Sequence, residues 1–171
     1  MANVVLIGMP GCGKSTIGVL LAKALKMDFL DTDVAFQNRQ DKRLQEIIEE
    51  VGVDAFLQME EACVLSLDAE DTVIATGGSV VYGEKAMRHL HEYGIVVYIR
   101  LPYAEIERRL FNLASRGVTL REGQTLRDLY NERISLYEKE ADIVFDPGKL
   151  NIEETAQALK ARMDDLMEGK K

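Results

Sequence analysis

The hydrophobic positions along this chain fall into five short runs, separated by longer amphipathic segments. Most of the runs are rich in β-branched residues and end at glycine or polar residues, which is typical of buried strands. They are NVVLIG (3–8), DFLD (28–31), TVIAT (72–76), IVVYIR (95–100) and DIVF (142–145). From Lys14 to Met27 apolar residues recur at helical spacing, with Lys23 and Lys26 on the other face. The chain therefore begins as a strand, a loop and a helix.

The alternation of strands and helices predicts one fold class. A parallel crossover needs about a dozen residues or more, so the pattern predicts an α/β protein with a five-stranded, mostly parallel sheet and helices on both faces. Two segments interrupt the alternation. Residues 34–70 carry helical patterns and no strand, which predicts a helical lobe over the sheet edge. Residues 115–125 are polar and basic between two helices, which is typical of a mobile lid.

Composition and charge narrow the possible functions. The chain has 171 residues, of which 47% are hydrophobic, enough for one buried core and too little for two ordinary domains. Its formal net charge of -8, without a basic block, argues against binding to nucleic acid or to a membrane surface. No apolar run nears the roughly 18 residues of a membrane span, and the start lacks a signal-peptide pattern. We therefore expect a monomeric, single-domain cytoplasmic protein that acts on a small molecule, with Cys12 and Cys63 reduced.

Residues 8–16, GMPGCGKST, match the pattern GxxxxGK[ST] directly after a strand and at the start of a helix. In this context the backbone N–H groups of the loop, here at Gly11, Cys12 and Gly13, turn inward to bind phosphate oxygens. The positive end of the helix dipole adds to that attraction. The stretch therefore predicts a phosphate-binding loop for a nucleoside triphosphate.

Three side chains at the end of this loop have predicted roles in binding ATP and Mg²⁺. Lys14 is expected to reach the β- and γ-phosphates, and the Ser15 hydroxyl to ligate Mg²⁺. Thr16 is expected to contact the α-phosphate. The loop fixes the donor, but it leaves open whether the protein is a GTP switch, a mechanical ATPase or a phosphotransferase.

Motifs elsewhere favour the phosphotransferase. A GTPase would carry an NKxD-type guanine motif on a late strand, and this chain has none. A mechanical ATPase usually has an acidic residue directly after an apolar strand, whereas TVIAT (72–76) runs into Gly77 and Gly78 without a carboxylate. The sequence therefore favours transfer of a phosphoryl group to a second substrate.

Candidate substrate residues follow the second and third predicted strands. FLDTD carries Asp31 and Asp33, and ligands in open α/β sheets bind at the carboxyl ends of strands, beside the loop. Asp31 is a candidate to hold Mg²⁺ through water, and Asp33 to accept a hydrogen bond and a proton from a substrate hydroxyl. The structural alternative is that Asp33 caps the next helix. Gly77 and Gly78 either let the backbone approach a ligand or make a tight turn.

Four elements in this order, GMPGCGKST, FLDTD, ATGGS and ERISLYEKEADIVFD, resemble the shikimate kinase family over essentially the whole chain. The resemblance implies a five-stranded parallel sheet, a substrate-binding helical lobe and a lid that carries arginine. It also implies ATP with Mg²⁺ on the donor side, and transfer of the γ-phosphoryl group to the 3-hydroxyl of shikimate.

The resemblance also implies roles for individual residues. Arg116 takes the place of a lid arginine that covers the transferring phosphoryl group, which makes Arg116, Lys14 and Asp33 the expected catalytic residues. Arg109 corresponds to an arginine near the adenine, and its alternative is an exposed charge on a helix. Arg133 in RISLY corresponds to an arginine that binds the substrate carboxylate. The resemblance places Gly77 and Gly78 against the substrate ring.

The chain departs from the family pattern at two positions in the substrate site. The family's lobe carries FRxxE, in which the arginine pairs with the shikimate carboxylate and the glutamate steadies that arginine. This chain has FLQME, with Leu57 at the arginine position and Glu60 retained. A hydrogen bond to a charged group contributes about 1.5 to 3 kcal/mol, so its loss predicts about ten- to hundredfold weaker binding of a carboxylate. Ser79 replaces a third glycine, and its side chain is expected to approach the ring pocket.

These departures leave the acceptor open. Shikimate held chiefly by Arg133 is the first hypothesis, and a related polyhydroxy acceptor such as gluconate or another polyol is the second. A nucleoside monophosphate ranks below both, because cations for a second phosphate are sparse in residues 34–60. The alternative from another class is an ATP-binding regulatory module without turnover.

Overall fold

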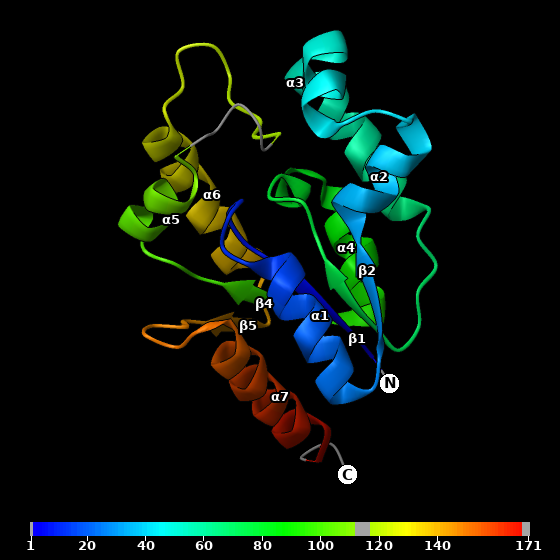
Figure 1. Ribbon diagram of the computed structural model, residues 1–171. Coiled ribbons are helices and arrows are strands. Elements are labelled where there is room, and N and C mark those ends of the chain that lie inside the picture. Colours follow the sequence, from blue (N-terminus) through cyan, green and yellow to red (C-terminus); the bar gives the residue numbers. More distant parts are fainter. Residues whose placement is uncertain (1, 112–116, 169–171) are drawn as a thin grey trace.

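A computed structural model, which describes residues 2–111 and 117–168, contains one five-stranded parallel sheet in the order β2-β3-β1-β4-β5 (Figure 1). The strands are β1 (Asn3–Ile7), β2 (Asp28–Asp31), β3 (Thr72–Ala75), β4 (Gly94–Ile99) and β5 (Ile143–Phe145). Each of the five predicted apolar runs is therefore a strand, and the predicted fold class is confirmed.

The helices described are α1 (Lys14–Leu25), α2 (Thr32–Gln40), α3 (Leu44–Leu65), α4 (Glu84–Tyr93), α5 (Tyr103–Arg109), α6 (Leu126–Glu140) and α7 (Ile152–Glu168), with a short 3₁₀ turn η1 (Val80–Tyr82). Helices α1 and α7 pack side by side on one face of the sheet, and α4 lies behind it (Figure 1). The sheet is thus covered on both faces, as the sequence predicts. None of the described helices is long and apolar enough to cross a membrane.

Burial on both faces explains why the strands are continuous apolar runs. Strand β1 lies at the centre of the sheet, and its residues Val4 to Ile7 are fully buried. Val5 is paired with Ile74 of β3 on one side and with Val96 of β4 on the other. Because every strand runs in the same direction, the carboxyl ends of all five lie at one edge of the sheet, where the glycine loop begins.

Helices α2 and α3 form the segment for which the sequence predicts a helical lobe. They pack on each other around a small apolar cluster of Phe36, Ile47, Phe56 and Cys63, separate from the main core. Helix α3 is kinked at Gly52, whose φ of 80° is outside the helical region. The segment contains helices and no strand, although α2 begins at Thr32, two residues before the predicted boundary. The substrate role of this lobe stays a prediction.

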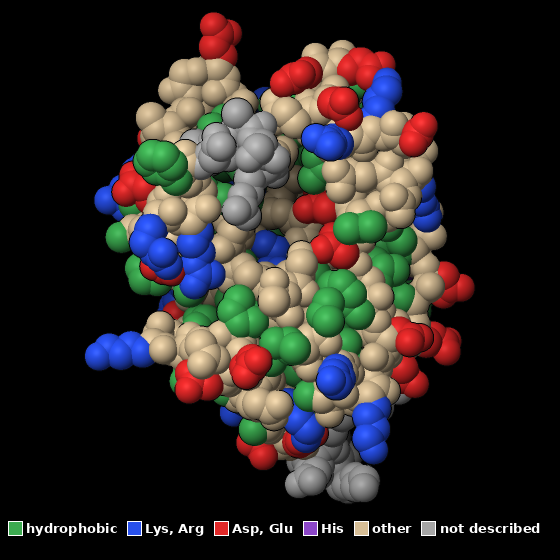
Figure 2. Space-filling model, viewed as in Figure 1, with side chains coloured by type: hydrophobic (Ala, Val, Ile, Leu, Met, Phe, Trp, Pro, Cys, Tyr) green, Lys and Arg blue, Asp and Glu red, His purple; other side chains and the backbone are tan. Residues whose placement is uncertain are grey.

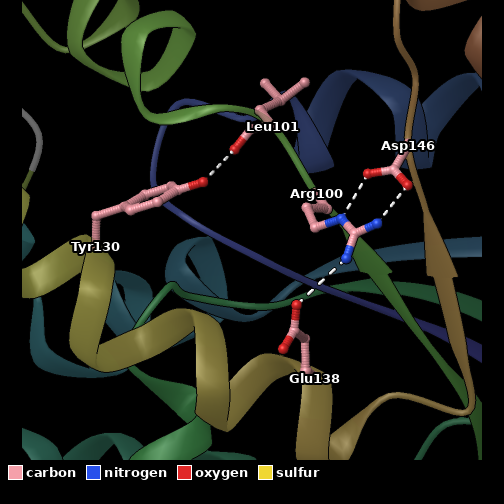
Figure 3. A network of polar contacts seen from close by, with 5 residues as sticks. All are labelled: Arg100, Leu101, Tyr130, Glu138 and Asp146. Atoms are coloured by element: carbon pink, nitrogen blue, oxygen red, sulfur yellow. Dashed lines mark hydrogen bonds and ion pairs between the residues drawn. The ribbon is translucent and has the colours of Figure 1, made fainter.

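Helix α6 is tied to the ends of two strands by a cluster of polar contacts (Figure 3). Arg100, which follows β4, donates from Nε and Nη2 to the carboxylate of Asp146 at 2.6 Å each, and from Nη1 to Glu138 of α6 at 3.2 Å. The Tyr130 hydroxyl of α6 donates to the carbonyl of Leu101 at 2.9 Å. These contacts fix α6 relative to the sheet edge at which the glycine loop lies.

Candidate active site

The glycine loop connects β1 to α1 and places Lys14 at the first position of that helix. Gly13 has φ 97°, a left-handed conformation that strains any residue with a side chain. The buried Lys14 ammonium donates to the carbonyls of Gly8 at 2.8 Å and Met9 at 3.0 Å. The loop therefore holds its own cation at a helix N-terminus, the arrangement that binds anionic phosphate groups.

Asp31 at the end of β2 connects this loop to α2. Its Oδ2 accepts a hydrogen bond from the Ser15 hydroxyl at 2.6 Å. Its Oδ1 accepts from the backbone N–H groups of Asp33 at 2.9 Å and Val34 at 3.2 Å, which caps α2. The helix cap is therefore Asp31, and the alternative role considered for Asp33 is wrong. Asp33 instead lies in the first turn, with its carboxyl free to face the cleft.

A cleft with a volume of about 280 Å³ lies between the glycine loop, the α2–α3 lobe and the middle of α6. The space-filling view shows a hollow in this region with acidic and basic side chains inside it (Figure 2). Its lining brings together the predicted residues Gly11, Gly13, Lys14, Ser15, Thr16, Asp33, Gly77, Gly78 and Arg133. The structure therefore collects residues from four separate parts of the sequence around one cleft.

Gly77 and Gly78 are positions that have no room for a side chain. A Cβ on Gly77 would lie 2.4 Å from Oε1 of Glu60 and 2.6 Å from Oδ1 of Asp33. A Cβ on Gly78 would lie 2.7 Å from Cδ of Pro10 and 2.9 Å from Nη1 of Arg133. Carbon does not approach other heavy atoms this closely, so glycine at both positions lets three charged side chains meet the backbone.

Four further polar residues line the cleft: Glu60 and Ser79, which the sequence analysis named beside the substrate site, and Thr76 and Thr119, which it did not name. Glu60 is only 4% exposed, and its Oε2 accepts a hydrogen bond from the Ser79 hydroxyl at 2.6 Å. Besides the family motif, a local signal for Glu60 is its place on α3, four residues after the buried Phe56 and four before the buried Val64. A carboxylate within the apolar face of a helix indicates a buried polar site.

The two carboxyl groups in the cleft have perturbed acidities. Burial, reinforced by the neighbouring Asp31 carboxylate, raises the pKa of Asp33 to about 6, and Lys14 opposes this rise. Burial also raises the pKa of Glu60 to about 7, while the hydrogen bond from Ser79 acts in the opposite direction. Both groups therefore change charge near neutral pH, a property of residues that handle protons or bind polar substrates.

Arg133 of α6 supplies the positive charge at the far side of the cleft. It is 1% exposed, donates from Nη2 to the Thr119 hydroxyl at 2.5 Å, and lies with its guanidinium 5.3 Å from the centre of the Tyr82 ring. Its Nε donates to the Tyr82 hydroxyl at 3.4 Å, and Tyr137 on the same helix donates to the carbonyl of Gly78 at 2.6 Å. The guanidinium is therefore held rigidly beside the glycine pair.

The remaining predicted residues lie elsewhere. Arg109 donates to the carbonyl of Gly11 at 3.3 Å and to Glu105 at 2.8 Å, so it contacts the outside of the glycine loop. The Cys12 side chain is buried, with its sulfur 3.7 Å from Nζ of Lys14, and does not line the cleft. Leu57 packs against the apolar cluster of the lobe and is absent from the cleft lining. Arg116 lies outside the described residues.

Comparisons with known proteins agree with this geometry. The model of the shikimate kinase family matches residues 10–164. A shikimate kinase of Clostridium botulinum (strain Loch Maree / Type A3) is 35% identical over 148 residues, which cover 84% of this chain and 87% of that protein. One of Thermodesulfovibrio yellowstonii is 34% identical over 173 residues, which cover 99% of both. The chain belongs to the shikimate kinase family.

Similarity extends to solved structures. A shikimate kinase from Acinetobacter baumannii, solved in complex with shikimate, superposes with a TM-score of 0.86 at 28% identity and covers 96% of this chain and 94% of that one. Family membership makes this chain an ATP-dependent phosphotransferase to an alcohol group, in the shikimate pathway. The predicted family and activity are therefore confirmed, and the alternative of a regulatory module without turnover falls away.

Proposed function

We propose that this protein phosphorylates the 3-hydroxyl of shikimate with ATP through the residues of the cleft described above. The observation that carries the proposal is the convergence of Lys14, Asp33 and Arg133 on one cleft whose floor is a pair of glycines. This cleft offers a site for a triphosphate, a carboxyl group for a hydroxyl and a guanidinium for a carboxylate.

On the donor side, the glycine loop binds the ATP phosphates. The backbone N–H groups of Gly11, Cys12 and Gly13 provide donors, and Lys14 exchanges its carbonyl partners for the β- and γ-phosphates. Thr16 is proposed for the α-phosphate.

The Ser15 hydroxyl and the Asp31 carboxylate are joined by a hydrogen bond beside the loop. Both offer oxygen atoms, which are the ligands that Mg²⁺ prefers. We assign these two residues to Mg²⁺, which would neutralise phosphate charge when bound.

On the acceptor side, Asp33 binds the reacting hydroxyl. The hydroxyl oxygen forms a bond to the γ-phosphorus, the bond from that phosphorus to the ADP oxygen breaks, and the hydroxyl proton passes to the Asp33 carboxylate. A pKa of about 6 keeps Asp33 unprotonated at neutral pH and basic enough to accept that proton. Gly77 and Gly78 allow the ring to approach the backbone.

Arginine residues complete the proposed site. Arg133 binds the carboxylate of shikimate by charge-assisted hydrogen bonds, which Leu57 cannot supply. Arg116 is proposed to stabilise the transferring phosphoryl group and Arg109 to lie near the adenine, both on the resemblance to the family. Residues 115–125 are proposed as the lid and residues 34–70 as the substrate-binding lobe.

We also propose a monomeric protein in the cytoplasm. The use of ATP and the two cysteines, which are both buried and free, support that location.

Steady-state phosphoryl transfer to a panel of acceptors tests the proposed function. The panel contains shikimate, quinate, gluconate, inositols and nucleoside monophosphates, and release of ADP is measured with and without each. We expect shikimate to give the highest kcat/KM. Negligible turnover of shikimate together with good turnover of another polyol would show that the acceptor has changed and that the carboxylate role of Arg133 is wrong.

A further inference from the structure

The hydrogen bond between Ser79 and Glu60 joins two residues that are 19 positions apart in the sequence and buried side by side in the cleft. Ser79 is 6% exposed and Glu60 is 4% exposed, and their oxygens are 2.6 Å apart. Ser79 lies between β3 and η1, whereas Glu60 lies on α3 of the lobe. The bond therefore fixes the orientation of a lobe carboxylate relative to the sheet.

No lysine, arginine or histidine among the described residues forms an ion pair with the Glu60 carboxylate. The residue three positions before Glu60 is Leu57, whose side chain packs into the apolar cluster of the lobe. The salt bridges found in the part of the chain that the structure describes do not include Glu60. Ser79 binds only Oε2, so Oε1 keeps its capacity to accept a hydrogen bond from a ligand.

The position of Oε1 shows which ligand groups it can meet. Oε1 of Glu60 and Oδ1 of Asp33 lie 2.4 Å and 2.6 Å from the place that a Cβ on Gly77 would occupy. The two oxygens are therefore at most about 5 Å apart beside the same glycine, and both residues line the cleft. The hydroxyl oxygens on neighbouring ring carbons lie closer together than this upper limit, and each can reach a carboxylate oxygen through a hydrogen bond of about 2.7 Å. A ring that offers one hydroxyl to Asp33 therefore brings the next within reach of Glu60.

We propose that Glu60 binds a second hydroxyl of the acceptor, next to the one that reacts, and that Ser79 is the positioning residue that holds Glu60 for this contact. The inference rests on the proposed function, because it takes Asp33 as the residue that binds the reacting hydroxyl. It assigns this chain a requirement for an acceptor with two adjacent hydroxyl groups, set by Glu60 and Ser79.

The charged and titratable groups around Glu60 come from three elements. Asp33 of α2 and Arg133 of α6 face it across the cleft, and the Cys63 thiol is its neighbour on α3. Burial, opposed by Ser79 and Arg133, raises the pKa of Glu60 to about 7. An ionised carboxylate accepts a stronger hydrogen bond than a neutral carboxyl group. Acceptor affinity is therefore expected to weaken as the pH falls below about 7.

The test measures kcat/KM for shikimate, 4-deoxyshikimate and 5-deoxyshikimate with wild type, Ser79→Ala, Glu60→Gln and the double variant. A hydrogen bond to a charged group accounts for about 10- to 100-fold, so each single variant should lose about that factor on shikimate. On 4-deoxyshikimate, which lacks the hydroxyl next to the reacting 3-hydroxyl, the variants should match wild type to within about threefold. On 5-deoxyshikimate, which keeps that hydroxyl, they should lose about as much as on shikimate. The double variant should lose no more than Glu60→Gln alone, because the two residues act as a unit.

The pH profile separates positioning from a structural effect. The KM of wild type for shikimate should rise below about pH 7, and this part of the profile should vanish in Glu60→Gln. In Ser79→Ala its midpoint should move to higher pH, because the lost hydrogen bond favours the ionised carboxylate. Glu61→Gln and Ser135→Ala, which change residues outside the cleft lining, are the matched controls and should behave as wild type. Thermal unfolding and ATP affinity confirm that each variant is folded.

Equal losses on shikimate and on 4-deoxyshikimate would overturn the inference, as would wild-type kinetics in Ser79→Ala. The proposed function is tested separately by wild-type turnover of shikimate. If wild type prefers another polyol, the same variants are measured on that polyol and its deoxy forms, so the two failures remain distinguishable.

Discussion

Replacing Gly77 with alanine adds one methyl group at the point where the two carboxyl groups of the cleft meet the backbone. That methyl would lie 2.4 Å from Oε1 of Glu60 and 2.6 Å from Oδ1 of Asp33, whereas ordinary van der Waals contacts begin at 3.4 Å. Each carboxyl group must therefore retreat by about 1 Å. A misplacement of about 1 Å in a reacting constellation costs about a hundredfold in rate, so we expect Gly77→Ala to lower kcat/KM for the acceptor about a hundredfold.

Steady-state release of ADP at saturating ATP measures this effect, and the affinity for ATP serves as an internal reference. ATP affinity should stay within about threefold of wild type, because neither carboxyl group displaced belongs to the glycine loop. Gly83→Ala is the matched control: its Cβ would lie 2.6 Å from a carboxylate oxygen of Glu61, which is outside the cleft lining. A folded Gly77→Ala protein with wild-type kcat/KM would refute the steric reasoning, and so would the same loss in Gly83→Ala.

Three further variants probe the charges of the molecule. Lys14→Met should lower kcat at least about a hundredfold, as measured by ADP release, because one well-placed donor to a developing charge contributes that much; Lys23→Met on the exposed face of the same helix should not. Because burial raises the pKa of Glu60 from 4.5 to about 7, the folded wild type binds more protons than the unfolded chain across that window and loses stability as the pH rises through it, by on the order of 3 kcal/mol. Glu60→Gln should escape this loss. Urea unfolding at pH 5 and pH 8 measures the free energy of unfolding of both proteins, and a gap between them that did not grow with pH would contradict the argument. Arg100→Met should lower the free energy of unfolding by about 1 kcal/mol or less in a denaturant titration, because solvent screens its ion pairs. Its kcat/KM, measured by ADP release, should stay at the wild-type value.

The sheet could be predicted from the sequence because its signal is local. Each strand is buried on both faces, so each is an uninterrupted apolar run such as NVVLI in β1, and the intervening segments are long enough for parallel crossovers. The end of a helix depends on the backbone conformation of single residues, which the apolar pattern does not show. Helix α1 ends at Leu25, two residues before the apolar pattern does, because Lys26 adopts a left-handed conformation with φ 58°.

The donor side of the site was also visible in the sequence, since the glycine loop is one continuous stretch. The acceptor side depends on contacts between distant residues, which no local pattern encodes. The bond of Ser79 to Glu60 and the approach of Glu60 to Gly77 both come from packing of the lobe on the sheet. The absence of Leu57 from the cleft lining likewise follows from the apolar cluster between α2 and α3.

Asp31 shows how one side chain can connect two parts of a protein. One of its oxygens caps α2 and the other accepts the Ser15 hydroxyl from the glycine loop. In genetic terms the position is pleiotropic, because a single substitution alters the start of the lobe and the proposed metal ligands together. Loss of activity in an Asp31 mutant would therefore not identify a catalytic defect. Substitution of Ser15 is the cleaner test of the proposed metal site, because Ser15 bonds to Asp31 but does not cap α2.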